Sequence, residues 1–128
     1  MTLTHTAFFG DGEHIFALTD DMIAELERLT DLGIGALYLR AVNMQFKLAD
    51  LVEIIRLGLI GGGTTPERAA QLIDTYARNR PIDELYPLAL DVLDARWGGN
   101  TRDEQPAPNF EAAASGDMAA ALNGASDA

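Results

Sequence analysis

The two histidines are the side chains of this sequence that could most readily bind a metal ion. His5 and His14 lie in or beside the strands of a predicted hairpin, where alternation places them on one face. No third histidine or carboxylate stands at a metal-ligand spacing such as HxxxH. Surface histidines with ordinary partners are therefore favoured over a weak metal site, and the sequence predicts no metal ion and no cofactor.

A glycine-rich run, RLGLIGGG at residues 56–63, resembles a phosphate-binding loop at first sight. A phosphate loop reads GxxxxGK[ST], but Thr64 follows Gly63 here and no lysine is near. A GxGxxG fingerprint follows a strand, whereas this run follows a helix. We expect Gly61, Gly62 and Gly63 to end that helix by entering the left-handed conformation. Gly58, inside it, predicts close backbone packing, since glycine there costs about 0.5–1 kcal/mol relative to alanine.

Asp50, Glu53 and Arg56 recur three residues apart and form a narrow polar stripe on the same helix. An exposed stripe with a Glu53–Arg56 pair, contributing about 0.2–0.5 kcal/mol, and a contact to a partner protein fit this spacing equally well. Other carboxylate pairs fit solvated helix starts, and both serines fall at 115 and 126, outside any triad. We therefore expect no catalytic residues and no enzyme activity.

The composition fits one soluble domain. The 128 residues carry a net charge of −11, are 48% hydrophobic and include no cysteine. This acidity excludes the basic surface that nucleic acids or anionic membranes require. The N-terminus lacks the basic and apolar regions of a signal peptide, and the expected location is the cytoplasm.

The element that organises the chain is a predicted helix from Leu48 to Ile60. It is apolar over most of its circumference, which predicts a central core helix. It is too short and too charged to span a membrane. Before it, Asp11-Gly12 predicts a hairpin turn that pairs Phe9 with His14 and Phe8 with Ile15. One hairpin face must pack on the helices, so Phe8 and Ile15 form a surplus apolar face.

Four more helices are predicted around the central one, at about 20–32, 34–43, 66–78 and 83–97. Pro66 fits a first helical position, Pro81 separates the last two helices and Pro87 falls in the first turn of the last. Leu90 and Trp97 lie off the inner stripe of that helix. The fold class is α+β and predominantly helical, with one domain over 1–99. Residues 100–128 predict a disordered acidic tail, with a transient helix at 111–122.

Residues 5–99 resemble a family of small proteins from the tail gene clusters of gene transfer agents and siphophage-like prophages. The likeness rests on FFGDGEHIFAL, EIIRLGLIGGG, TTPERAAQLIDTY, Arg80-Pro81 and LALDVLDA. Its motif residues are Arg56, Gly58, Leu59, Gly61, Gly62, Gly63 and Pro81. Members are described as phage tail tube proteins, gene transfer agent proteins or tail assembly chaperones.

The resemblance implies two different functions. A tail tube subunit is built around a β-barrel and needs many strands, whereas an assembly chaperone is small, acidic and mostly helical. We therefore expect a tail assembly chaperone that binds the tape-measure protein or other tail proteins in the bacterial cytoplasm and forms homo-oligomers. Candidate interface residues are Phe8, Ile15, Leu90, Trp97, Asp50 and Glu53. A virion-associated structural tail component is the first alternative, and a small acidic adaptor unrelated to tails is the second.

Overall fold

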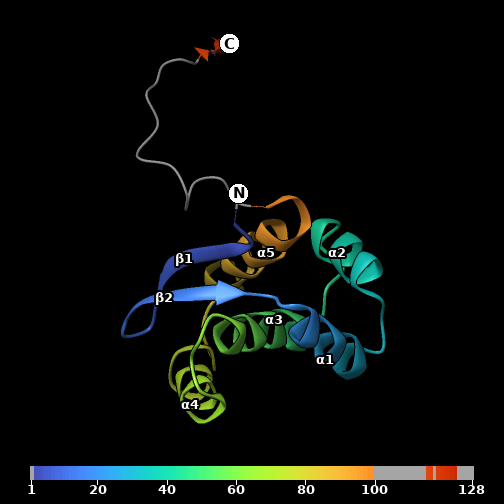
Figure 1. Cartoon of the computed structure of the whole chain (residues 1–128), viewed down its shortest axis with the longest axis vertical. Coiled ribbons are helices and arrows are strands. Elements are labelled where there is room, and N and C mark those ends of the chain that lie inside the picture. The colour runs from blue at the N-terminus through green and yellow to red at the C-terminus, as the bar shows by residue number, and fades with distance from the viewer. Residues whose placement is uncertain (1, 100–114, 117, 124–128) are drawn as a thin grey trace.

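The computed structural model describes residues 2–99, 115–116 and 118–123 (Figure 1). Strands β1 (Thr4–Phe9) and β2 (Gly12–Ala17) form an antiparallel hairpin. The helices that follow are α1 (Asp20–Thr30), α2 (Ile34–Val42), α3 (Leu48–Gly61), α4 (Pro66–Tyr76) and α5 (Ile82–Gly98). The predicted fold class, a hairpin followed by about five helices, is confirmed.

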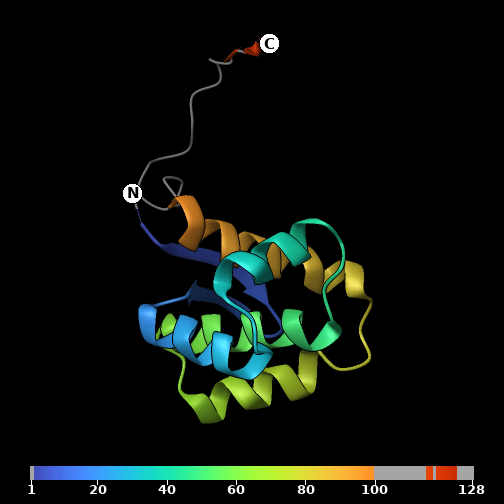
Figure 2. The same ribbon diagram turned by 90° about the vertical axis from the view of Figure 1, so that its right-hand side faces the viewer.

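Helix α3 lies at the centre of the core, as its sequence predicts. It contacts β2, α1, α4 and α5, and the hairpin covers α3 and α5 from one side (Figures 1 and 2). Its fully buried side chains are Leu51, Ile54, Ile55, Leu57 and Leu59. Helix α2 packs against α1 and α5, and its contact with α5 completes one side of the molecule.

The hairpin turns at Gly10-Asp11, one residue before the predicted Asp11-Gly12 turn. Gly10 has a φ of +71°, and a Cβ atom there would lie 2.4 Å from Cδ2 of Tyr76. Both the backbone conformation and the ring of Tyr76 therefore require glycine at the first turn position. Arg68 of α4 donates a hydrogen bond to Asp11 and fixes the turn to the same helix.

The earlier turn changes the strand pairing but not the faces. Phe9 pairs with Gly12 and Phe8 pairs with Glu13, so the predicted pairs of Phe9 with His14 and Phe8 with Ile15 are wrong. The predicted pairing is offset by two residues, and an offset of two leaves each side chain on its own face. The hairpin therefore buries Phe9 and exposes Phe8 and Ile15, as predicted.

The helix starts mostly follow the predicted signals. Thr65 accepts a hydrogen bond from the backbone N–H of Arg68, and Pro66 is the first residue of α4. Pro81 directly precedes α5 and separates it from α4. Pro87, however, lies in the second turn of α5, because the helix already begins at Ile82. Its side chain is exposed, and the helical hydrogen bond to the carbonyl oxygen of Asp83 is not formed, because proline has no backbone N–H.

The predicted disordered tail, 100–128, lies mostly outside the described residues. Within it, β3 (Ser115–Gly116) and β4 (Met118–Asn123) pair in parallel as a separate sheet. The helix predicted at 111–122 is therefore absent at these described positions. Ser115 and Gly116 disfavour a helix, but the Met-Ala-Ala-Ala-Leu run of β4 does not, and helix propensity does not explain its strand. No helix in the described part of the chain is long and apolar enough to cross a membrane.

Candidate interaction surfaces

The first carboxylate of the predicted polar stripe is buried. Asp50 is 2% exposed, and its Oδ2 accepts hydrogen bonds from Nη2 of Arg40 at 2.7 Å and from the backbone N–H of Lys47 at 2.8 Å. The pair joins α2 to α3 and caps the start of α3. The exposed-stripe prediction is wrong for Asp50, because Arg40 of α2 reaches this carboxylate and pairs with its charge. Asp50 is not accessible to a partner protein in this fold.

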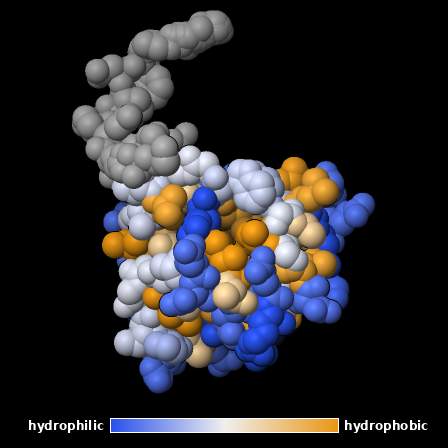
Figure 3. All heavy atoms as spheres, turned by 45° about the vertical axis from the view of Figure 1, so that its right-hand side comes forward, coloured by the Kyte–Doolittle hydropathy of each residue, from blue (hydrophilic) through white to orange (hydrophobic). Residues whose placement is uncertain are grey.

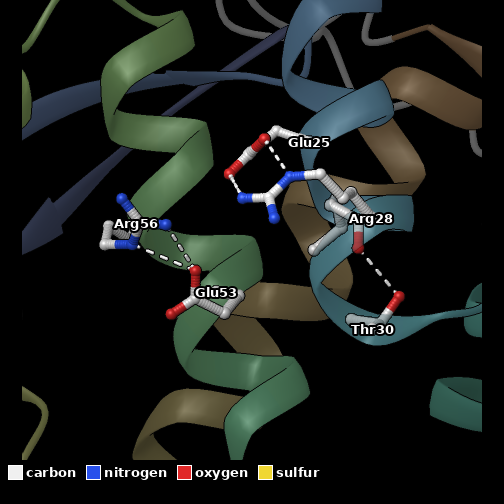
Figure 4. A network of polar contacts seen from close by, with 6 residues as sticks. Glu25, Arg28, Thr30, Glu53 and Arg56 are labelled. Carbon is white, nitrogen blue, oxygen red and sulfur yellow. Dashed lines mark hydrogen bonds and ion pairs between the residues drawn. The ribbon is translucent and has the colours of Figure 1, made fainter.

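The rest of the stripe, Glu53 and Arg56, forms one ion pair on α3 that lies opposite the Glu25–Arg28 pair of α1 (Figure 4). Nη2 of Arg56 lies 2.6 Å from Oε1 of Glu53, and both side chains are half-buried. Opposite them, Nε of Arg28 donates to Glu25 at 2.9 Å. The hydrogen bond from Arg28, with the charges of Arg28 and Arg56, keeps the pKa of Glu25 below its ordinary value although desolvation opposes this. Glu53 is thus engaged inside the chain, and its predicted interface role stays a prediction.

The glycines at the end of α3 lie where β2 crosses it. A Cβ atom at Gly61 would lie 1.8 Å from the carbonyl oxygen of Ala17, and one at Gly62 would lie 1.8 Å from that of Ile15. Only Gly63 has a positive φ, +115°, while Gly62 keeps a φ of −85°. Left-handed helix closure is therefore wrong for Gly61 and Gly62. These positions are glycine because the backbone of β2 passes directly against them.

Gly58 takes part in the same contact one turn earlier. A Cβ atom there would lie 3.2 Å from Cγ1 of Val92 and 3.4 Å from Cδ2 of Phe16. This agrees with the close packing that the sequence predicts for Gly58. The neighbouring motif residue Leu59 is fully buried. The motif RLGLIGGG thus forms the contact between α3, β2 and α5 rather than an exposed site.

Each histidine lies near one carboxylate. Nε2 of His14 lies 2.9 Å from Asp11, and Nε2 of His5 lies 3.7 Å from Asp91. Within the described residues, no three acidic or histidine side chains form a group that could hold a metal ion.

The outer face of the hairpin exposes two large apolar side chains. Phe8 is 69% exposed and Ile15 is 48% exposed. They are not cross-strand neighbours, because Phe8 pairs with Glu13 and Ile15 pairs with Thr6. Phe8 also lines a cleft of about 380 Å³ together with residues of α4 and α5. The interface role of Phe8 and Ile15 stays a prediction.

The surplus apolar residues of α5 lie beside α2. Trp97 is 57% exposed and stacks on Tyr38 of α2, with ring centroids 4.5 Å apart. The hydroxyl of Tyr38 donates to Oδ1 of Asp94 at 2.6 Å, and this bond, with partial burial, raises the pKa of Tyr38. The hydroxyl of Tyr86 donates to the carbonyl oxygen of α2 at Ala41, 3.0 Å away. Leu90, one turn from both Tyr86 and Asp94, therefore lies on the α5 stripe that faces α2 and is half-buried.

A second apolar surface, the outer face of α2, has no counterpart among the predicted interface residues. Leu39 is 60% exposed and Val42 is 45% exposed, and Met44 just beyond the helix is 65% exposed. The one charged residue of α2, Arg40, is engaged by Asp50. The sequence signal for this surface was the near absence of charge from IGALYLRAV. Figure 3 shows orange, hydrophobic residues gathered in patches on this side of the molecule.

One comparison with known proteins identifies a family. The family model described as "Phage tail tube protein, GTA-gp10" matches residues 2–99, which include the hairpin and all of α1 to α5. No curated protein and no solved structure matches the chain. The match favours a tail-related role over an adaptor unconnected with tails, and it associates the chain with the tail proteins of phage-like particles. The chain belongs to the GTA-gp10 family of phage tail tube proteins.

Proposed function

We propose that this family member is a tail assembly chaperone that binds the tape-measure protein, and not a subunit of the tube wall. The observation that carries the proposal is the fold. A tube subunit built on a β-barrel needs enough strands to close the barrel. Over residues 2–99 the sheet has two strands, β1 and β2, and the remaining elements are helices. This part of the chain cannot form a barrel wall by itself.

The surface supports a function in protein binding. Each arginine of residues 2–99 forms an ion pair with an acidic residue of the same chain. No arginine in this range is therefore free for phosphate groups, and the net charge of −11 disfavours nucleic acid further. The proposed activity is binding without catalysis, since exposed apolar side chains are the groups offered to a partner.

Location and assembly state follow from the same proposal. The chaperone acts in the cytoplasm of the bacterial host while tails assemble, and it leaves before the particle is complete. Its outer hairpin face, with Phe8 and Ile15, is the proposed contact between copies of the chain. Light scattering coupled to gel filtration tests this contact: oligomers of the wild type should become monomers in Phe8→Asp. A wild-type monomer at high concentration contradicts it.

The chaperone function is tested by co-expression with a tape-measure protein from the same source as this chain. We expect the tape-measure protein to be recovered in soluble form on the tagged chain and to be poorly soluble when expressed alone. An unrelated acidic helical protein with the same tag serves as the control bait. Recovery that does not differ between the two baits contradicts the proposal.

A structural tail component is the second candidate, and the description of the family favours it. In that case the chain would be present in purified particles in a fixed ratio to the major tail protein. The two candidates thus predict opposite compositions of the finished particle.

A further inference from the structure

Helices α2 and α5 expose neighbouring stripes of residues at helical spacing. On α2 the stripe contains Gly35, Leu39 and Val42. On α5 it begins at Asp83, passes the half-buried Leu90 and ends at the exposed Trp97. The Tyr38–Trp97 stack and the hydrogen bond from Tyr86 to α2 hold the two helices together. Residues at i, i+4 and i+7 form a ridge that packs into the groove of another helix. We name this surface the α2–α5 face.

Among residues 2–99, no segment covers the outer side of this face. A Cβ atom at Gly35 would meet only Cη2 of Trp97, at an ordinary distance of 4.0 Å. Leu39 is 60% exposed although it is a large apolar side chain on a regular helix. Exposed apolar surface of this kind marks an interaction site when its neighbours are also apolar.

The charges around the face indicate what kind of partner it accepts. Asp31 precedes α2, and Asp83 and Asp94 lie on α5; none of these three forms an ion pair within the described residues. Arg40 of α2 is bound to Asp50 at 2.7 Å. The apolar centre is thus edged by carboxylates whose charge no arginine neutralises. Complementarity requires positive charge on the partner.

The same charges disfavour two other occupants. A second copy would bring an identical acidic face, and like charges would then meet across the contact. Residues 100–128 carry five acidic groups and one arginine, so this segment of the chain would meet the same repulsion.

The length of the face sets the length of helix that it accepts. The stripe on α5 from Asp83 to Trp97 is about 21 Å long at 1.5 Å per residue, the length of a helix of about 14 residues.

We propose that the α2–α5 face binds an amphipathic helix whose apolar stripe is flanked by lysine or arginine. Identifying this helix as a segment of the tape-measure protein rests on the proposed chaperone function. Binding places apolar anchors of the partner over Leu39 and Trp97, and it places the basic flanks near Asp31, Asp83 and Asp94.

Trp97 is the one tryptophan of the chain and reports directly on this face. The probe is an 18-residue Leu/Lys peptide that forms an amphipathic helix, titrated into the full chain while tryptophan emission is recorded. We expect a blue shift that saturates and that requires more peptide as salt increases. A peptide of the same composition, scrambled to lose helical periodicity, should leave the emission unchanged.

Paired variants separate the face from the rest of the surface. Leu39→Gln should weaken peptide binding about tenfold, because an apolar anchor is lost. Leu29→Gln is the matched control, because this exposed leucine belongs to α1, a helix that does not form the face; the variant should bind as the wild type does. Replacing the three aspartates by asparagine should also weaken binding about tenfold and flatten its salt dependence. The control for that change is Glu13→Gln, Asp21→Asn and Glu67→Gln.

The outcomes distinguish this inference from the proposed function. Unchanged emission, an equal response to the scrambled peptide, or equal effects of Leu39→Gln and Leu29→Gln would overturn the inference. If Leu39→Gln weakens peptide binding but still retains the tape-measure protein fully, the tape-measure protein does not bind at this face. The inference is then overturned, while the chaperone function stands. If the peptide binds through Leu39 but the wild type never retains the tape-measure protein, the chaperone function fails and the basic-helix site stands.

Discussion

Glycine serves opposite purposes at the β2–α3 contact and on the α2–α5 face. At the first, Gly61 and Gly62 leave room for the backbone of β2, whose carbonyl oxygens would lie 1.8 Å from any added Cβ atom. On the second, Gly35 leaves room that no other part of the described chain fills. Both regions are rich in apolar and small residues, but only one finds its partner inside the fold. The difference teaches that an apolar segment without an internal partner is a candidate for an external one.

The largest expected effect comes from filling the internal contact. Gly62→Ala forces β2 away from α3 and should lower the free energy of unfolding by about 3 kcal/mol. Chemical denaturation followed by circular dichroism measures it. Gly12→Ala in the same hairpin is the control, because a Cβ atom there meets nothing within 4 Å. Equal stability of the two variants would remove the contrast between the regions.

The next effect tests what holds α2 in place beneath its exposed face. Arg40→Met leaves the buried carboxylate of Asp50 without its cation and should cost about 2 kcal/mol of stability. Arg78→Met is the control, since its pair with Asp74 is exposed and contributes little. Thermal melts of both variants measure the difference. A melting temperature of Arg40→Met as high as that of Arg78→Met would show that the pair does not secure α2.

A small stabilisation is expected where the exposed glycine is filled. Gly35→Ala replaces a poor helix former and adds a Cβ atom at an unstrained distance from Trp97. The free energy of unfolding should rise by about 0.5 kcal/mol. Denaturation under the conditions used for Gly62→Ala gives the comparison. A loss of stability instead would reveal an internal role for this glycine and weaken the contrast.

The smallest effect concerns the hydrogen bond that joins the two helices of the exposed face. The bond to Asp94 raises the pKa of Tyr38, so its contribution to stability is fully present below the ordinary tyrosine pKa of about 10. That contribution is lost as pH rises through the raised value. Asp94→Ala should return the pKa of Tyr38 toward its ordinary range. NMR of the labelled Tyr38 ring over a pH series measures this change. An unchanged titration would contradict the role of this bond.

Hydrophobic periodicity predicts the elements of this fold well, because each helix carries its own pattern. It does not predict contacts between elements distant in the chain. Asp50 and Arg40 belong to different helices, and the spacing on α3 alone cannot reveal that Arg40 of α2 pairs with Asp50. Likewise, the reason for Gly61 and Gly62 lies in β2, about 45 residues earlier. The hairpin faces are nevertheless correct, since an offset of two residues preserves alternation.

The exposed face of α2 was open to prediction and was missed for an identifiable reason. The inner stripe of this helix, with Leu37 and Ala41, is buried as its spacing predicts. Assigning that stripe leaves Leu39 and Val42 on the outer side, where polar residues are the norm. A helix with a single charged residue therefore indicates a second apolar side. Here that side is exposed, and it is where we propose that a partner helix binds.

Purified particles test the central claim most directly. Quantitative mass spectrometry of complete tails gives the ratio of this chain to the major tube protein. We predict that the chain is abundant in lysates of assembling cells and absent from purified tails. A fixed ratio of this chain to the major tube protein in purified tails, as for subunits of a ring, would contradict the chaperone function. It would identify the chain as a structural component.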